Sequence, residues 1–142
     1  MKYPLDTDHI SIWQRGSGPE YLALRANLQK QAPGDVALCV VSFHEQVLGC
    51  DTYIVRARTT ADVLRGYAML SRMLADYAAV AVLGFDTAAG AAYDSMQAQR
   101  IRIGAMDLRL ASIALSRGLV LLSRNLGDFG RVPGLAIENW TV

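Results

Sequence analysis

Short apolar runs alternate with helical patterns along the whole chain, and this alternation restricts the possible folds more than any other feature. The apolar runs span residues 1–5, 36–41, 80–83 and 119–122, with a weaker one inside 134–142. The helical patterns cover residues 8–15, 19–31, 87–99 and 107–117, and two more begin near 42 and 60. Strands that alternate with helices indicate an α/β fold built on a central, mostly parallel sheet of four or five strands flanked by helices.

Two of the expected helices carry more specific patterns. Ser42 and Glu45 are spaced like the capping box that opens a helix. In the helix after residue 60, apolar side chains share one stripe, for which packing in the core is favoured over contact with a partner. The stripe consists of Val63, Tyr67, Leu70, Leu74 and Tyr77.

Length and composition limit the class of protein. The chain has 142 residues, which predicts a single domain over 1–142, and its 52% hydrophobic and 19% charged content excludes disorder. No apolar run approaches the ~18–20 residues that span a bilayer. The start of the chain becomes acidic at Asp6, too early for a signal peptide. We therefore expect a soluble cytoplasmic protein with no membrane contact.

Four carboxylates follow the predicted strands or open the helix that leads into one. Asp6 follows the first strand, Glu45 lies just after the second, and Asp128 follows the fourth, while Asp107 opens the helix that precedes the fourth strand. Ligands of parallel sheets bind outside the carboxyl ends of the strands, so these four side chains are expected to gather there. Each also has a purely structural explanation, as a helix cap, a first-turn acid or a turn residue. Their shared position at one sheet edge favours function.

A cluster of carboxylates indicates a site for a hard divalent cation. Like charges repel one another unless a cation neutralises them, and Mg²⁺ or Mn²⁺ prefers oxygen ligands. One or two such ions can activate a water and stabilise the leaving oxygen of a phosphodiester. A thiol-based zinc site is not expected, because Cys39 and Cys50 form no C-x-x-C pair. His9 and His44 lie near acidic candidates, but lone histidines are more typical of surface or supporting groups than of catalytic ones.

Four segments around these carboxylates carry motifs. Residues 5–9 read L-D-T-D-H, residues 41–49 read V-S-F-H-E-Q-V-L-G, residues 102–111 read R-I-G-A-M-D-L-R-L-A, and residues 122–129 read L-S-R-N-L-G-D-F. In order, with suitable gaps and over essentially the whole chain, they resemble the four motifs of PIN-domain toxins of the VapC-like class. Any one of them is weak evidence, whereas four in register are strong evidence.

The resemblance implies a three-layer PIN-like fold and a metal-dependent endoribonuclease. Asp6, Glu45, Asp107 and Asp128 would be the catalytic residues that hold Mg²⁺ or Mn²⁺, and Ser123 and Asn125 would orient those carboxylates. Most members of the family are neutralised by a small antitoxin protein encoded beside them, and most form homodimers. The RNA would be cut by attack of water.

Three positions depart from the usual motifs without removing a carboxylate. Asp8 stands where many members have Asn, Ser123 where Thr is usual, and Leu110 where Ile is usual. The change at Ser123 keeps a hydroxyl, and the change at Leu110 concerns packing. We expect Asp8 to support the site rather than to bind the cation directly.

Contacts to RNA are less clearly predicted. The net charge is only +1, and the excess of Arg over Lys is more simply explained by a GC-rich genome than by RNA binding. Arg124 and Arg102 lie near the predicted site in sequence and are the candidates for phosphate contacts.

Three alternatives remain at this point. Asp6-Thr7-Asp8 comes close to the nucleophile motif of haloacid-dehalogenase-type phosphatases, but the only lysines, Lys2 and Lys30, come too early for that family. A PIN-like module that binds RNA without cutting it would be expected to lack acidic positions. A housekeeping PIN nuclease for RNA processing would share the chemistry of a toxin.

Overall fold

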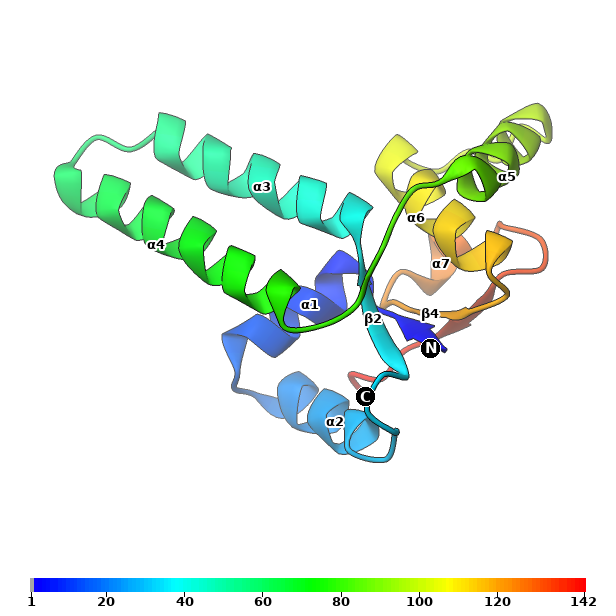
Figure 1. Ribbon diagram of the computed structural model, residues 1–142, viewed down its shortest axis with the longest axis horizontal. Helices are drawn as coiled ribbons and strands as arrows, with labels where there is room; N and C mark the ends of the chain where they lie inside the picture. Colours follow the sequence, from blue (N-terminus) through cyan, green and yellow to red (C-terminus); the bar gives the residue numbers. More distant parts are fainter. Residues whose placement is uncertain (1) are drawn as a thin grey trace.

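The computed structural model describes residues 2–142 and places strands and helices in the expected alternation (Figure 1). Met1, which the sequence assigns to the first strand, lies outside the described residues. The strands are β1 (Tyr3–Pro4), β2 (Val36–Cys39), β3 (Val82–Leu83), β4 (Val120–Leu122) and β5 (Ala136–Glu138). The helices are α1 (Thr7–Arg15), α2 (Pro19–Leu28), α3 (Val40–Val55), α4 (Thr60–Ala78), α5 (Thr87–Ala98), α6 (Ala105–Ser116) and α7 (Leu126–Phe129).

All of the strand pairs are parallel. Strand β2 pairs with β1 on one side and β3 on the other, and β4 pairs with β5. A parallel bridge between Leu5 and Leu122 joins β1 to β4, which gives the order β3-β2-β1-β4-β5. The carboxyl ends of β1, β2 and β4 therefore meet at one edge, and the short edge strand expected within 134–142 is present as β5.

Alternate residues of the strands point to opposite faces of the sheet, as the pleat requires. Ala37 and Cys39 of β2 pack with Leu121 in one core, which α5 and α6 cover. Leu38 and Leu122 belong to a second core, which includes buried residues of α1, α2 and α4. A core on each face of the sheet confirms the three-layer α/β arrangement.

Helix α3 begins earlier than the sequence predicts. Strand β2 ends at Cys39, and the helix starts at Val40, so the expected strand over 36–41 is two residues too long. Ser42 and Glu45 therefore lie inside the helix, and the capping-box prediction is wrong. The apolar pair at 40 and 41 reads equally well as strand or as buried helix, and tertiary packing decides between them.

Helices α3 and α4 run side by side as a hairpin that extends away from the strands (Figure 1). Gly66 lets them approach closely, because a Cβ there would lie 2.5 Å from Cγ1 of Ile54. The predicted core stripe on α4 holds only in part, since Tyr77 is buried whereas Tyr67 and Leu74 are 55% and 60% exposed. The hairpin extends beyond the sheet, so these two apolar side chains of α4 lie at the surface of the described chain.

The remaining elements deviate from the predictions mainly at their ends. Asp86 caps α5 as its position suggests, accepting from the N–H of Ala89 at 2.9 Å, and Gly118 adopts the left-handed conformation that ends α6. The predicted buried strand over 80–83 is reduced to Val82–Leu83, and Val80 and Val82 are exposed. None of the helices formed by residues 2–142 combines the length and the apolar composition needed to cross a bilayer.

Candidate active site

Asp6 lies where β1 meets α1 and is almost fully buried, with 6% of its surface exposed. Its backbone N–H donates to the carbonyl of Leu122 at 2.8 Å, which holds the ends of β1 and β4 side by side. Its Oδ1 accepts from the N–H of Thr7 at 2.7 Å, so Asp6 is the N-cap of α1. Its Oδ2 accepts from the hydroxyl of Ser123 at 2.7 Å. The capping role and the position in the site thus coexist in one side chain.

Glu45 and Asp107 come from two helices that begin near the same sheet edge. Helix α3 follows β2 without a loop, and Oε1 of Glu45 accepts from the hydroxyl of Thr7 at 3.1 Å. Asp107 lies in the first turn of α6, where the helix dipole favours a negative charge. The N-cap of α6 is Gly104, which offers no side chain to the free N–H groups of the first turn.

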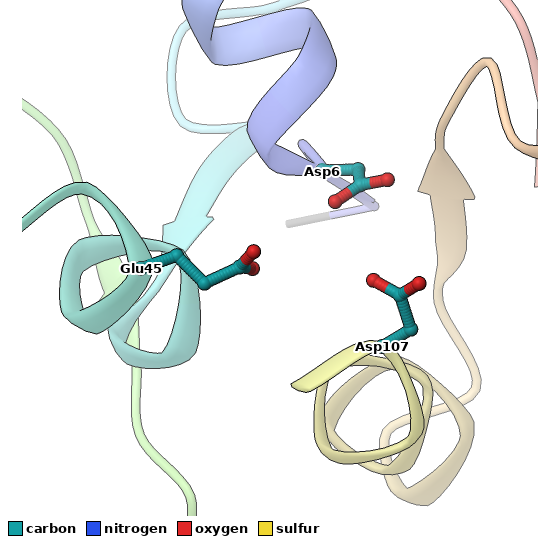
Figure 2. A group of neighbouring side chains, drawn as sticks. All are labelled: Asp6, Glu45 and Asp107. Carbon is teal, nitrogen blue, oxygen red and sulfur yellow. The ribbon is translucent and has the colours of Figure 1, made fainter. Parts of the chain in front are cut away.

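Three carboxylates converge at this edge. One oxygen each from Asp6, Glu45 and Asp107 lies within 4.8 Å of the others. Figure 2 shows the three side chains pointing toward one another from the start of α1, from α3 and from the first turn of α6. The structure thus brings together three of the four carboxylates that the sequence singles out.

Burial, together with neighbouring negative charges, raises the pKa of two of these carboxylates. Burial, and then the charge of Asp8, raise the pKa of Asp6 from 3.8 to about 7, although the hydrogen bonds from Ser123 and Thr7 oppose this shift. Burial, followed by the charges of Glu45 and Asp128, also raises the pKa of Asp107. The ionised cluster is therefore unfavourable without a positive charge beside it.

The side chains present fit a hard divalent cation. Within residues 2–142 no Lys, Arg or His forms an ion pair with Asp6, Glu45 or Asp107. The cluster offers only carboxylate oxygens, which suit Mg²⁺ or Mn²⁺, and none of the sulfur or imidazole ligands typical of structural zinc sites.

Asp128 lies outside this group of three. It is in α7, where the Nδ2 of Asn125 donates to its Oδ2 at 3.1 Å and Arg131 lies 3.7 Å from its Oδ1. Its side chain is 40% exposed. Its charge is one of the smaller causes of the raised pKa of Asp107, after burial and the charge of Glu45.

Ser123 and Asp8 lie on the side of the site where Asp6 is buried; Ser123 is fully buried, and the side chain of Asp8 is 29% exposed. Besides donating to Asp6, the hydroxyl of Ser123 accepts from the N–H of Asn125 at 3.0 Å. Asp8 is not in the converging group, and its Oδ2 accepts from the N–H of Arg124 at 2.9 Å. These contacts are the ones that the predicted orienting roles of Ser123, Asn125 and Asp8 require, and the roles themselves stay predictions.

Arg124 and Arg102, the candidates for RNA contact, are both exposed. Within residues 2–142 neither of their side chains forms an ion pair. The backbone N–H of Arg124 donates to Asp8 at 2.9 Å, which fixes the main chain next to Ser123.

Sequence reasoning missed Thr7 and left open whether His9 lies at the surface, whereas the structure buries it. Thr7 links two of the carboxylates, through its N–H to Asp6 and its hydroxyl to Glu45. His9 is fully buried, and its Nδ1 lies 2.6 Å from Oδ1 of Asp8. The D-T-D-H order of the opening motif is the one signal that could have drawn attention to both.

No protein-family model matches the chain. Curated proteins do match it over its length. The chain is 30% identical to the tRNA(fMet)-specific endonuclease VapC of Salmonella typhimurium strain LT2, across 99% of this chain and 98% of the relative. It is 29% identical to Ribonuclease VapC2 of Haemophilus influenzae, again across 99% and 98% of the two chains.

Solved structures agree on the fold. A chain of DNA-bound VapBC from Salmonella typhimurium superposes with a TM-score of 0.77 at 24% identity, covering 99% of this chain and 98% of the other. VapBC-1 from nontypeable Haemophilus influenzae gives a TM-score of 0.72 at 22% identity, with both chains fully covered. The chain is thus 30% identical to a VapC endonuclease over nearly the full length of both proteins, and the carboxyl edge of its parallel sheet gathers three acidic side chains. It belongs to the VapC family of PIN-domain ribonucleases.

Proposed function

We propose that this protein is a Mg²⁺- or Mn²⁺-dependent endoribonuclease and the toxin of a toxin–antitoxin pair. The observation that carries the proposal is the convergence of Asp6, Glu45 and Asp107 within 4.8 Å in a chain of the VapC family. The reaction is hydrolysis of an RNA phosphodiester. The oxygen of water bonds to phosphorus, one P–O ester bond breaks, and the leaving ribose oxygen receives a proton.

In this proposal Asp6, Glu45 and Asp107 hold the cation. When bound, it would offset their mutual repulsion, make a water more nucleophilic and stabilise charge on the leaving oxygen. Asp6 has the most strictly defined position, because each of its carboxylate oxygens accepts a hydrogen bond, one from Thr7 and one from Ser123. Thr7 sets the distance between Asp6 and Glu45 by bonding to both.

Asp128 is the fourth catalytic carboxylate in this proposal and acts from the exposed side of the site. Asn125 orients it through the bond from Nδ2 to Oδ2 at 3.1 Å. Because its side chain is 40% exposed and its ion pair with Arg131 is long, it can turn toward a cation when RNA is present. Asp8 supports the site without binding the cation.

The expected partners are RNA, a small antitoxin and a second copy of this chain. Solved relatives of the same fold are described as VapBC complexes, and one is described as a toxin–antitoxin complex from Klebsiella pneumoniae. We place the activity in the cytoplasm, with cellular RNA as substrate. Two curated relatives are named tRNA(fMet)-specific endonucleases, which makes initiator tRNA the first RNA to test.

Two of the alternatives are less well supported. Family membership sets aside the haloacid-dehalogenase-type phosphatase, and both carboxylate oxygens of Asp8 already accept hydrogen bonds, from His9 and Arg124. A non-catalytic RNA-binding module would not need a converging set of acids. A housekeeping nuclease would use the same site, so the effect of the protein on growth distinguishes it from a toxin.

The test is cleavage of total RNA and of initiator tRNA by purified, antitoxin-free protein. We expect discrete products with Mg²⁺ or Mn²⁺, none with EDTA, and none from Asp6→Asn or Asp107→Asn. Asp94→Asn is the matched control, because Asp94 is an exposed acid on α5 outside the site. Cleavage that persists in EDTA or in both site variants would refute the proposal. Growth arrest that a neighbouring small gene reverses would support the toxin role over housekeeping.

A further inference from the structure

His9 is a buried histidine whose two ring nitrogens both have partners. Its surface exposure is 0%. Nε2 accepts from the backbone N–H of Trp140 at 3.1 Å, and Nδ1 lies 2.6 Å from Oδ1 of Asp8. A ring nitrogen that accepts a hydrogen bond from an N–H carries no proton, so the ring proton is on Nδ1, which donates a hydrogen bond to Asp8. The backbone of the C-terminal segment therefore dictates the tautomer of a side chain next to the active site.

From Asp8 the contacts lead directly to the cation-binding side chains. The oxygen that His9 does not use accepts from the N–H of Arg124 at 2.9 Å, and it lies 3.4 Å from the hydroxyl of Ser123. That hydroxyl donates its proton to Asp6 at 2.7 Å. Burial acts to raise the pKa of Asp8, but the hydrogen bonds from His9 and Arg124 lower it below its ordinary value.

On its other side His9 meets a firmly anchored C-terminal segment. The carbonyl of Trp140 accepts from Nδ2 of Asn27 at 3.2 Å, and its ring packs against Tyr3 with centroids 4.6 Å apart. Two residues earlier, the carbonyl of Glu138 accepts from the N–H of Ser123 at 2.9 Å. The segment over 138–140 thus reaches the loop after β4 twice, once directly and once through His9 and Asp8.

We propose that His9 is a positioning residue that ties the C-terminal segment to the acidic site. By holding Asp8, it fixes the backbone N–H of Arg124 and with it the position of the preceding residue, Ser123, whose hydroxyl donates to Asp6. The proposal rests on the nuclease function proposed above, since the site it shapes is the cation site of that function. No contact between His9 and RNA or the cation is required.

Two substitutions separate positioning from simple filling of the core. In His9→Asn, the amide nitrogen can replace Nδ1 as the donor to Asp8, while the acceptor for Trp140 is lost. In His9→Gln, the amide oxygen can replace Nε2 as the acceptor from Trp140, while the donor to Asp8 is lost. If His9 only fills space, the two variants should behave alike apart from a shared loss of stability.

The experiment measures Mn²⁺ affinity by electron paramagnetic resonance and amide hydrogen exchange by NMR on the full chain. We expect His9→Gln to bind Mn²⁺ about tenfold more weakly and His9→Asn within about twofold of wild type, as for other groups that orient metal ligands. The amide of Arg124 should exchange faster in His9→Gln, and that of Trp140 faster in His9→Asn. His44→Gln, at the exposed second histidine, serves as the control.

Equal Mn²⁺ affinities in the two His9 variants, together with equal exchange at Arg124, would overturn the proposal. Hydrogen exchange is measured without the cation, so it decides the positioning role independently of the proposed function. A wild-type protein that bound no Mn²⁺ would refute the proposed function, and exchange at Arg124 would still accept or reject the role of His9.

Discussion

The two sides of the active site are built differently. On one side, Asp6 is 6% exposed, and hydrogen bonds from the N–H of Thr7 and the hydroxyl of Ser123 hold both of its carboxylate oxygens. On the other side, the side chain of Asp128 is 40% exposed; within residues 2–142 its carboxylate accepts one hydrogen bond, from Asn125, and lies 3.7 Å from Arg131. The fold itself holds the buried side, whereas we propose that the exposed side adjusts when a cation or RNA binds.

The two sides also differ in the electrostatic free energy of their carboxylates. Holding Asp6 in a buried place next to other acids raises its pKa to about 7, so the fold bears an electrostatic cost that a cation would relieve. Asp128 remains partly in water, where screening reduces such costs. A site with one fixed and one adjustable side can bind a cation tightly and still accommodate a bulky polyanion.

The largest effect is expected on the rate of RNA cleavage when one carboxylate from each side of the site is substituted. Asp6→Asn should lower the single-turnover rate of RNA cleavage about 10³-fold, or about 4 kcal/mol of transition-state stabilisation, since Asn keeps the helix cap but removes a charged ligand. Asp128→Asn should lower it only about tenfold, because Asp128 is not in the converging group. Equal losses in the two variants would mean that both sides bind the cation alike.

The second prediction concerns the stability of the cation-free protein as a function of pH. The pKa of Asp6 is about 7 when folded and near 3.8 when unfolded, so the folded state holds this proton more tightly. Its contribution to stability is fully present below about pH 4 and is lost as the pH rises to about 7. At about 1.4 kcal/mol for each pKa unit, the loss is on the order of a few kcal/mol.

Urea denaturation in EDTA at pH 4.5 and pH 8 measures this effect. Asp6→Asn cannot ionise, so it should gain stability relative to wild type between the two pH values. Excess Mg²⁺ should reduce the gain at pH 8 by neutralising Asp6 in the wild type. Asp128→Asn is the comparison from the exposed side: it keeps Asp6, so it should lose stability between pH 4.5 and pH 8 as the wild type does. A difference between Asp6→Asn and wild type that does not change with pH would contradict the buried, unfavourable charge.

The third prediction tests whether the supporting carboxylate differs from the ligands. Asp8→Asn replaces one of the two acceptor oxygens, so either His9 or Arg124 loses its hydrogen bond. Mn²⁺ affinity, measured by titration, should fall about tenfold, which is less than for Asp6→Asn. If Asp8→Asn weakens binding as severely as Asp6→Asn does, Asp8 is a direct ligand.

The three converging carboxylates could be predicted from the sequence. Asp6 and Glu45 follow β1 and β2, and Asp107 opens the helix that leads into β4, so their positions along the chain place them at the carboxyl edge of a parallel sheet. The same argument brought in Asp128 but could not say that α7 would hold it farther out. A distance of a few ångströms depends on loop packing, which strand order does not determine.

The network behind Asp6 was less accessible to prediction. His9 contacts Trp140, which is 131 residues away in the sequence, and a contact of that kind leaves no local pattern. The start of α3 was also misplaced, because Val40 and Val41 suit a strand and a buried helix equally well. On α4, the exposure of Tyr67 and Leu74 depends on how far the hairpin projects from the sheet, and helical spacing alone does not contain that information.

The smallest expected effect concerns RNA binding at the boundary between the two sides. Arg124 is exposed, its backbone is fixed by Asp8 on the buried side, and the next residue, Asn125, orients Asp128 on the exposed side. A phosphate contact there would contribute affinity without sequence preference and would release about one counterion. Arg124→Ala should therefore weaken binding of a fluorescent single-stranded RNA a few-fold in EDTA. It should also reduce the slope of the logarithm of the binding constant against the logarithm of the salt concentration by about 0.7.

The control is Arg58→Ala, in the exposed loop between α3 and α4 at the far end of the hairpin, which should leave both the affinity and the salt slope unchanged. If the two variants have the same salt slope, RNA does not pass over Arg124, and Arg102 becomes the residue to test, because it too is exposed and lies in the segment that leads into α6 and Asp107.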